Sequence, residues 1–195
     1  MSENSLNPIS IAGQLIPAAT NFVLPGGRTA QLSVVNFTGF DMTYLKSDIA
    51  HGKVQVPKGE ATKNTTDAFP TKLYAEKHNT SSDPDSPTNK EDVDIEDNNT
   101  FIVTNDDGAL IGAFGSVDYQ FNVTTGGEKP EILGEVTVTI YWNHPYGSST
   151  SSYNVKFSTN DESLNKYLGS YALSPSQPTG HDQRIEISIL YNEMK

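Results

Sequence analysis

The feature that most constrains the fold is a series of short runs in which apolar and polar residues alternate. These runs are rich in Val, Ile, Thr, Tyr and Phe, and Gly, Asn, Asp and Pro separate them. Alternation with a period of two is typical of a strand with one buried face. We therefore predict eight strands, at residues 30–37, 42–46, 53–56, 100–104, 115–123, 135–142, 152–157 and 184–191. Eight strands without a helical period predict an all-β fold, an antiparallel β-sandwich.

Two of these runs predict which side chains form the core. In residues 135–142 the side chains on one face are all apolar: Val136, Val138, Ile140 and Trp142. In residues 184–191 three isoleucines share a face, at positions 185, 187 and 189. Glu186 and Ser188 lie between these isoleucines, and we expect both to face water.

Length and composition indicate one sandwich domain with an insertion. The chain has 195 residues, of which 35% are hydrophobic, enough for one substantial core. We expect an N-terminal arm at 1–27 and the sandwich at 28–195. Residues 59–99 are rich in Asp, Asn, Thr, Ser and Pro, so we interpret them as a polar surface insertion, with a short strand near KLYAE and a disordered centre at 77–99. Residues 162–173 fit either a short helix or a strand.

The charge of the chain limits its partners. A formal net charge of -11 opposes sequence-independent binding to nucleic acid and to anionic membrane surfaces. We therefore expect a neutral, zwitterionic or basic partner and no nucleic acid. There is no cysteine, so disulfides and thiolate sites are excluded. The N-terminus lacks a basic n-region, and no apolar stretch reaches the roughly 20 residues of a spanning helix. These features predict a soluble protein without a cleaved signal peptide.

Neither a catalytic motif nor a metal motif is present in the sequence. The four histidines (His51, His78, His144 and His181) have no paired spacing, and both GxSxG and the phosphate loop are missing. The acidic run EDVDIED at 91–97 has Asp97 where a calcium loop needs glycine, so a solvated loop is the better interpretation. We expect a protein that is not an enzyme and that has no cofactor and no metal site.

An aromatic cluster is the strongest functional signal. The stretch YWNHPYGSSTSSY, residues 141–153, holds Tyr141, Trp142, Tyr146 and Tyr153. Pro and Gly around Tyr146 favour a turn that presents rings at the edge of a sheet. Tyr and Trp suit membrane interfaces and bind quaternary ammonium groups through their π faces. The alternative is that Trp142 closes one end of the core, and the residues alone leave both interpretations open.

The same stretch carries a resemblance to a family. YWNHPYGSSTSSYNV (141–155) resembles the aegerolysin signature, Tyr-Trp-Asp-Cys-Pro-Trp-Gly-Ser followed by a polar run, an aromatic residue and Val. VVNFTGFDMTYLKSDIAHGK (34–53) is similar to the first hairpin of that family and its Trp-Gly-Lys corner. TFIVTNDDGALIGAFGSVDYQF (100–121) resembles the stretch that contains its Glu-Gly-Thr-x-Gly turn. At four family positions this chain has other residues: His51 for the corner Trp, Ile111 for Glu, His144 for Cys and Tyr146 for the second Trp.

The resemblance implies a fold and a function. Aegerolysins are β-sandwiches that bind membrane lipids, notably sphingomyelin with cholesterol or ceramide phosphoethanolamine, and many form pores with a perforin-like partner. It therefore implies the lipid-recognition component of a two-component cytolysin or insecticidal toxin. Its partners would be a sphingolipid, with or without sterol, and a perforin-like protein, with oligomers on the membrane. The implied lipid-binding residues are His51, Lys53, Trp142, Tyr146 and Tyr153, and Trp142 would be structural at its base and interfacial at its rim. Release by a non-classical route and action at target-cell membranes would follow.

Other functions remain open beside this one. Pro145-Tyr146 and Asn154-Val155-Lys156 resemble, more weakly, a segment of the actinoporins, which form pores without a partner. That mechanism needs an amphipathic N-terminal helix, and Pro8, Gly13 and Pro17 interrupt residues 1–22. A carbohydrate-binding lectin would stack the same rings on sugars, and a structural sandwich would have no ligand.

Overall fold

The computed structural model describes residues 28–55, 69–75, 99–105, 111–125, 131–147 and 150–190. Three predictions therefore fall outside the described residues: the N-terminal arm at 1–27, the acidic run at 91–97 and the centre of the insertion. Everything below concerns the described ranges.

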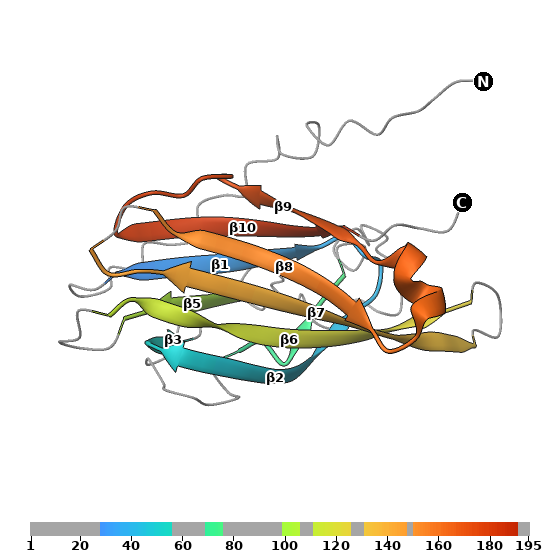
Figure 1. Ribbon diagram of the computed structural model, residues 1–195. Helices are drawn as coiled ribbons and strands as arrows, with labels where there is room; N and C mark the ends of the chain where they lie inside the picture. The colour runs from blue at the N-terminus through green and yellow to red at the C-terminus, as the bar shows by residue number, and fades with distance from the viewer. Residues whose placement is uncertain are drawn as a thin grey trace, which may run out of the picture.

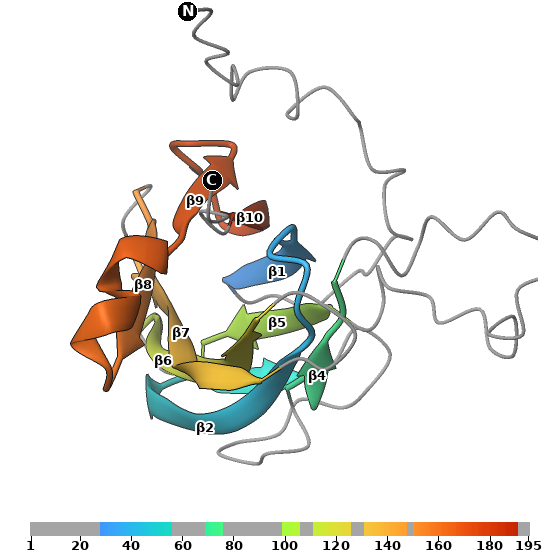
Figure 2. The same cartoon turned by 90° about the vertical axis from the view of Figure 1, so that its right-hand side faces the viewer.

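The described strands form two five-stranded sheets that face each other (Figures 1 and 2). The first sheet has the order β3 (Lys53–Gln55), β5 (Thr100–Thr104), β1 (Thr29–Asn36), β10 (Asp182–Leu190) and β9 (Ser170–Ser174). The second has the order β4 (Lys72–Leu73), β2 (Met42–His51), β6 (Ala113–Thr124), β7 (Ile132–His144) and β8 (Ser152–Thr159). The prediction of an all-β sandwich is confirmed.

The pairing is antiparallel with one exception. β1 and β10 run parallel at the centre of the first sheet, starting from the pair Thr29 and Asp182. Between these two strands the chain crosses to the second sheet and back three times, and this supplies the long connection that a parallel pair needs. Both strands therefore begin at the same end of the sandwich, and this end contains the candidate site.

The inner faces of the sheets form one core. Val136, Val138, Ile140 and Trp142 are all buried, as their alternation predicts. The ring of Trp142 packs against Phe101 and Phe69, with centroids 5.8 and 6.0 Å away. Large aromatic rings that meet at such distances contribute beyond the area they bury. The core of this sandwich is therefore closed by aromatic contacts at the end of β7.

One prediction about the outer face of β10 is wrong. The three isoleucines at 185, 187 and 189 are buried, as expected. Ser188 is also buried, whereas the alternation placed it in water. β10 is a central strand, and Val35 of β1 and Ala172 of β9 flank Ser188 in the sheet. Neighbouring strands on both sides thus shield an outward-facing side chain from water, and alternation within one strand does not predict this burial.

The insertion is not wholly a surface feature. Phe69 lies in the core, and β4 forms the short strand predicted near KLYAE and pairs with β2. The side chain of Asn99 donates to the carbonyls of Val34 and Tyr74, and its oxygen accepts from the backbone N–H of Tyr74 at 3.1 Å. These bonds attach both flanks of residues 76–98 to the sandwich. The polar composition of residues 59–99 concealed the apolar residues that anchor it.

Residues 162–173 contain both structures that the sequence allowed. A 3-10 helix, η4 (Glu162–Tyr167), comes first and β9 follows it. Asp161 caps η4 by accepting a hydrogen bond of 2.8 Å from the backbone N–H of Ser163. Leu164 is buried and packs closely against Gly134 of β7. Within the described ranges, no helix combines the length and the apolar character that crossing a bilayer requires.

Candidate functional site

The chain crosses from the second sheet to the first at Gly52, between β2 and β3. Gly52 has a φ of 91°, and a Cβ at this position would lie 2.5 Å from the carbonyl oxygen of Thr104. Only glycine fits this corner without strain. The corner places His51 and Lys53 on either side of the turn. The imidazole of the exposed His51 packs edge-on against the ring of Phe114, with centroids 5.9 Å apart.

Tyr146 lies in the turn that follows β7. Gly147 takes a positive φ of 77° there, and the Tyr146 side chain is 44% exposed. The guanidinium of Arg28 lies 6.0 Å from the centre of the Tyr146 ring and donates to the carbonyl of Pro145. Arg28 itself is buried, and its backbone N–H donates to the side chain of Asn105 at 2.9 Å. The exposed ring is therefore supported by a buried cation.

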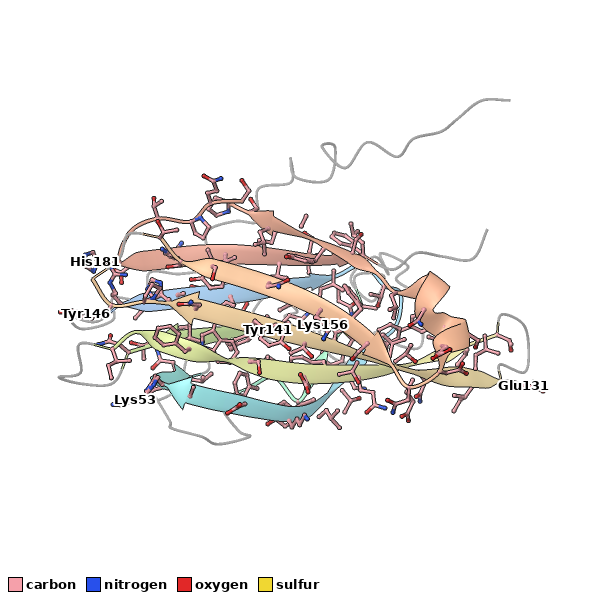
Figure 3. All side chains as sticks on the ribbon, viewed as in Figure 1. Lys53, Glu131, Tyr141, Tyr146, Lys156 and His181 are labelled. Atoms are coloured by element: carbon pink, nitrogen blue, oxygen red, sulfur yellow. The ribbon has the colours of Figure 1, made fainter. Side chains whose placement is uncertain are left out.

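These residues share one end of the sandwich, which we call the Tyr146 end and define by His51, Lys53, Ile111, Tyr146 and His181. Figure 3 shows Lys53, Tyr146 and His181 at this end and Glu131 at the opposite end. Ile111 is exposed, and the adjacent Gly112 lies directly against the carbonyl of His144. An exposed aromatic ring and an exposed aliphatic side chain thus share one end of the sandwich with Lys53 and two histidines, although the whole chain is acidic. This combination suits the polar boundary of a lipid bilayer.

Two of the predicted lipid-binding residues are buried and are not exposed at this end. Trp142 is only 2% exposed and Tyr153 is 5% exposed, because both face inward from paired positions on β7 and β8. The phenol of Tyr153 donates to the side-chain oxygen of Gln183 at 2.8 Å, and burial raises the pKa of Tyr153. The expectation of an interfacial rim on Trp142 is therefore not met, since the indole fills the end of the core. His51, Lys53 and Tyr146 do meet at one end.

A buried histidine holds the loops of the Tyr146 end together. His144 is fully buried, and its Nδ1 lies 2.6 Å from the hydroxyl of Ser151, while its Nε2 lies 3.0 Å from the carbonyl oxygen of His181. A carbonyl only accepts, so Nε2 carries the proton and Nδ1 accepts from Ser151. Desolvation lowers the pKa of His144, which keeps the ring neutral.

A hydrogen-bonded Ser and His also form part of a catalytic triad, but the surroundings of this pair differ from those of a triad. Ser151 is buried, and the second nitrogen of His144 meets a backbone carbonyl instead of an orienting carboxylate. The pair therefore connects the β7–β8 loop to the loop before β10. Among the described residues, no group of three or more His, Asp or Glu is placed to hold a metal ion.

Sequence reasoning missed several members of this end. Arg28 meets Pro145 across 117 positions, and His144 meets the carbonyl of His181 across 37. No local pattern marks such contacts, because they depend on the pairing of strands. Among these residues only His144 could have been singled out from the sequence, because it occupies the position of the Cys in the aegerolysin signature.

Comparison with solved structures shows what this fold is similar to. The crystal structure of RahU protein in complex with a TRIS molecule matches with a TM-score of 0.50 and 12% identity, over 86% of this chain and 98% of RahU. The chain is similar in fold to RahU. The lipid-binding protein Nakanori matches more weakly, with a TM-score of 0.41 and 13% identity, over 86% of this chain and 72% of Nakanori.

At these identities the likeness concerns the fold alone. The match with RahU supports the β-sandwich fold that the resemblance implies. No family model and no curated protein matches the sequence.

Proposed function

We propose that this chain binds membrane lipid through the Tyr146 end. The observation that carries the proposal is the exposed Tyr146 ring, which the buried Arg28 supports at the same end of the sandwich as Lys53, His51 and the exposed Ile111. A ring with a polar tip can enter the interfacial layer while the ammonium of Lys53 meets headgroup phosphates. The aegerolysin resemblance supports this function, and the likeness to RahU concerns the fold alone.

The preferred lipid is a zwitterionic sphingolipid, with or without sterol. A chain with a net charge of -11 gains nothing overall from an anionic surface, since like charges repel. The resemblance supplies the choice of sphingolipid, and the Tyr146 end supplies groups suited to a zwitterionic headgroup. In this proposal the protein is released by a non-classical route, acts at target-cell membranes and assembles there with a perforin-like partner.

A pair of tyrosines tests the location of the binding surface. Tyr141 and Tyr146 are 40% and 44% exposed, but Tyr141 lies within β7 and Tyr146 lies in the turn beyond it. We expect Tyr146→Ala to lose sedimentation with sphingomyelin–cholesterol vesicles and Tyr141→Ala to keep it. Both variants should melt close to the parent, since exposed substitutions usually change stability by less than about 0.5 kcal/mol. Equal binding by both variants would contradict the proposed surface.

The choice of lipid has its own test. Binding to sphingomyelin vesicles should persist at about 0.5 M salt, because screening weakens only the ionic part of the contact. Strong binding to phosphatidylserine vesicles that disappears with salt would overturn the preference for a zwitterionic lipid. Binding on a glycan array without vesicle binding would instead favour the lectin function.

A further inference from the structure

One buried imidazole connects the two loops that carry Tyr146 and His181. Residues 145–147 and 150–151 are the described parts of the connection from β7 to β8, and residues 175–181 precede β10. His144 accepts a hydrogen bond from Ser151 in the first loop and donates one to the backbone carbonyl of His181 in the second. A second buried link runs beside it, from Tyr153 to Gln183 and from Gln183 to the carbonyl of Gly180 at 3.0 Å. The first link contains an imidazole whose pKa is lowered by desolvation.

A proton on His144 would reverse this arrangement. The neutral ring has one acceptor and one donor, whereas the imidazolium has two donors. Nδ1 could then no longer accept from Ser151, whose hydroxyl would have to turn and act as the acceptor. A positive charge would also appear in a fully buried position, which is costly without a hydrogen-bonded anion.

The charged groups around the ring do not offset that cost. Arg28 carries a positive charge in the same end and disfavours a second one, as does His181. Asp182 favours the imidazolium, but its carboxylate is exposed and accepts a hydrogen bond of 2.7 Å from the hydroxyl of Thr29. Ser151, Tyr153 and Gln183, the other polar side chains of this network, are uncharged at neutral pH. The surroundings of His144 therefore favour the neutral imidazole over the imidazolium.

We propose that His144 is a positioning residue for the Tyr146 end, and that its protonation releases the two loops and weakens lipid binding in mild acid. This inference rests on the proposed function. The pKa of His144 is lowered, so the unfolded or opened chain takes up the proton first. Stability of the closed arrangement is complete above about pH 6.5 and declines as the pH falls below it. The aegerolysin signature has a Cys at this position, so pH-dependent positioning by His144 would be a feature of this chain and not of that signature.

The single tryptophan gives a direct readout. Trp142 precedes His144 by two positions on β7 and is the only tryptophan of the chain. We expect binding to sphingomyelin–cholesterol vesicles to fall by at least about tenfold between pH ~7 and pH ~5, equivalent to ~1.4 kcal/mol. The emission of Trp142 should shift over the same pH range in the absence of lipid.

Substitutions separate His144 from the other histidines. In His144→Gln an amide supplies one donor and one acceptor without a titratable proton, so the acid loss of binding and the shift in emission should both flatten. His51→Gln and His181→Gln should keep the acid loss, whatever they do to the affinity at neutral pH. Ser151→Ala removes the donor to Nδ1, so its acid transition should move to higher pH, and this variant serves if His144→Gln does not fold.

Each outcome decides between the two proposals. Retention of the acid loss in His144→Gln, or a pH-independent parent, would overturn the positioning role while lipid binding stands. A parent that binds no vesicle at neutral pH would overturn the proposed function. In that case the emission of Trp142 and the NMR titration of His144 still show whether the ring controls the loops.

Discussion

The two ends of the sandwich both expose apolar side chains, yet they differ in the charged groups that surround those side chains. β7 connects them: it begins with Ile132 at one end and ends with His144 at the other, a span of roughly 40 Å at about 3.3 Å per residue. We call the first the hairpin end and define it by the start of β7, the end of β6 and η4. Its Ile132 is 66% exposed, more than any apolar residue of the Tyr146 end.

The surroundings of these apolar groups differ. At the hairpin end Glu131, Glu135 and Glu162 are exposed, and η4 carries Asp161 as its cap. At the Tyr146 end Arg28 lies beneath the exposed ring, and Lys53 and two histidines share that end with one exposed carboxylate, that of Asp182. Carboxylates beside an apolar group oppose contact with headgroup phosphates, whereas cations favour it. We therefore base the proposed lipid surface on the charges around the exposed apolar groups as well as on the exposed apolar area.

The largest expected effect comes from the ring beneath the Tyr146 end. Trp142→Ala removes an indole that packs on Phe69 and Phe101, so the free energy of unfolding should fall by roughly 3 to 5 kcal/mol. Vesicle binding should be lost with the fold. Urea denaturation measures the first effect, and Tyr141→Ala on the adjacent position is the control. A stable Trp142→Ala protein that no longer binds vesicles would show that the indole contacts lipid after all.

A core change at the hairpin end should separate stability from binding. Leu164→Ala removes the side chain that packs η4 against Gly134, and the expected loss is about 2 to 3 kcal/mol. The folded fraction should still sediment with sphingomyelin–cholesterol vesicles, because the Tyr146 end is untouched. Loss of binding at a temperature where circular dichroism shows a folded variant would mean that the two ends are coupled.

The sequence predicted the parts of this comparison that depend on local pattern. The strand at 100–104 occurs with the predicted bounds, and the buried face of β7 follows its alternation. The position of Tyr146 in a turn follows from its Pro and Gly neighbours. Local chemistry is sufficient here because a strand shows its period, and a turn its residue types, within a few positions.

The remaining features depend on contacts between distant segments. Nothing near Arg28 in the sequence indicates that it supports Tyr146, and the partners of His144 come from two separate loops. The same reason explains Phe69, a core residue in a polar segment. Burial of such residues is decided by which strands pair, and the strand order is a property of the whole chain.

A smaller effect is expected from the insertion, whose flanks join the fold beside β1. Asn99 and Tyr74 are hydrogen-bonded to each other, so both flanks of residues 76–98 meet at one point. Replacing residues 77–97 by a Gly/Ser linker of about half their length should change the unfolding free energy by only ~0.6 kcal/mol through loop closure. Thermal melting measures this change. Loss of the cooperative transition would show that the replaced residues contribute to the core.

The variant with the smallest expected effect tests the comparison of the two ends most directly, because it removes the most exposed apolar side chain of the hairpin end. A double variant of Ile132→Ser and Leu133→Ser changes two exposed side chains of the hairpin end. Its unfolding free energy should stay within about 0.5 kcal/mol of the parent. Its sedimentation with sphingomyelin–cholesterol vesicles should equal that of the parent, whereas Tyr146→Ala should not sediment. The reverse result, with the serine variant failing and Tyr146→Ala binding, would place the lipid surface at the acidic end and would show that exposed aliphatic area outweighs the supporting cations.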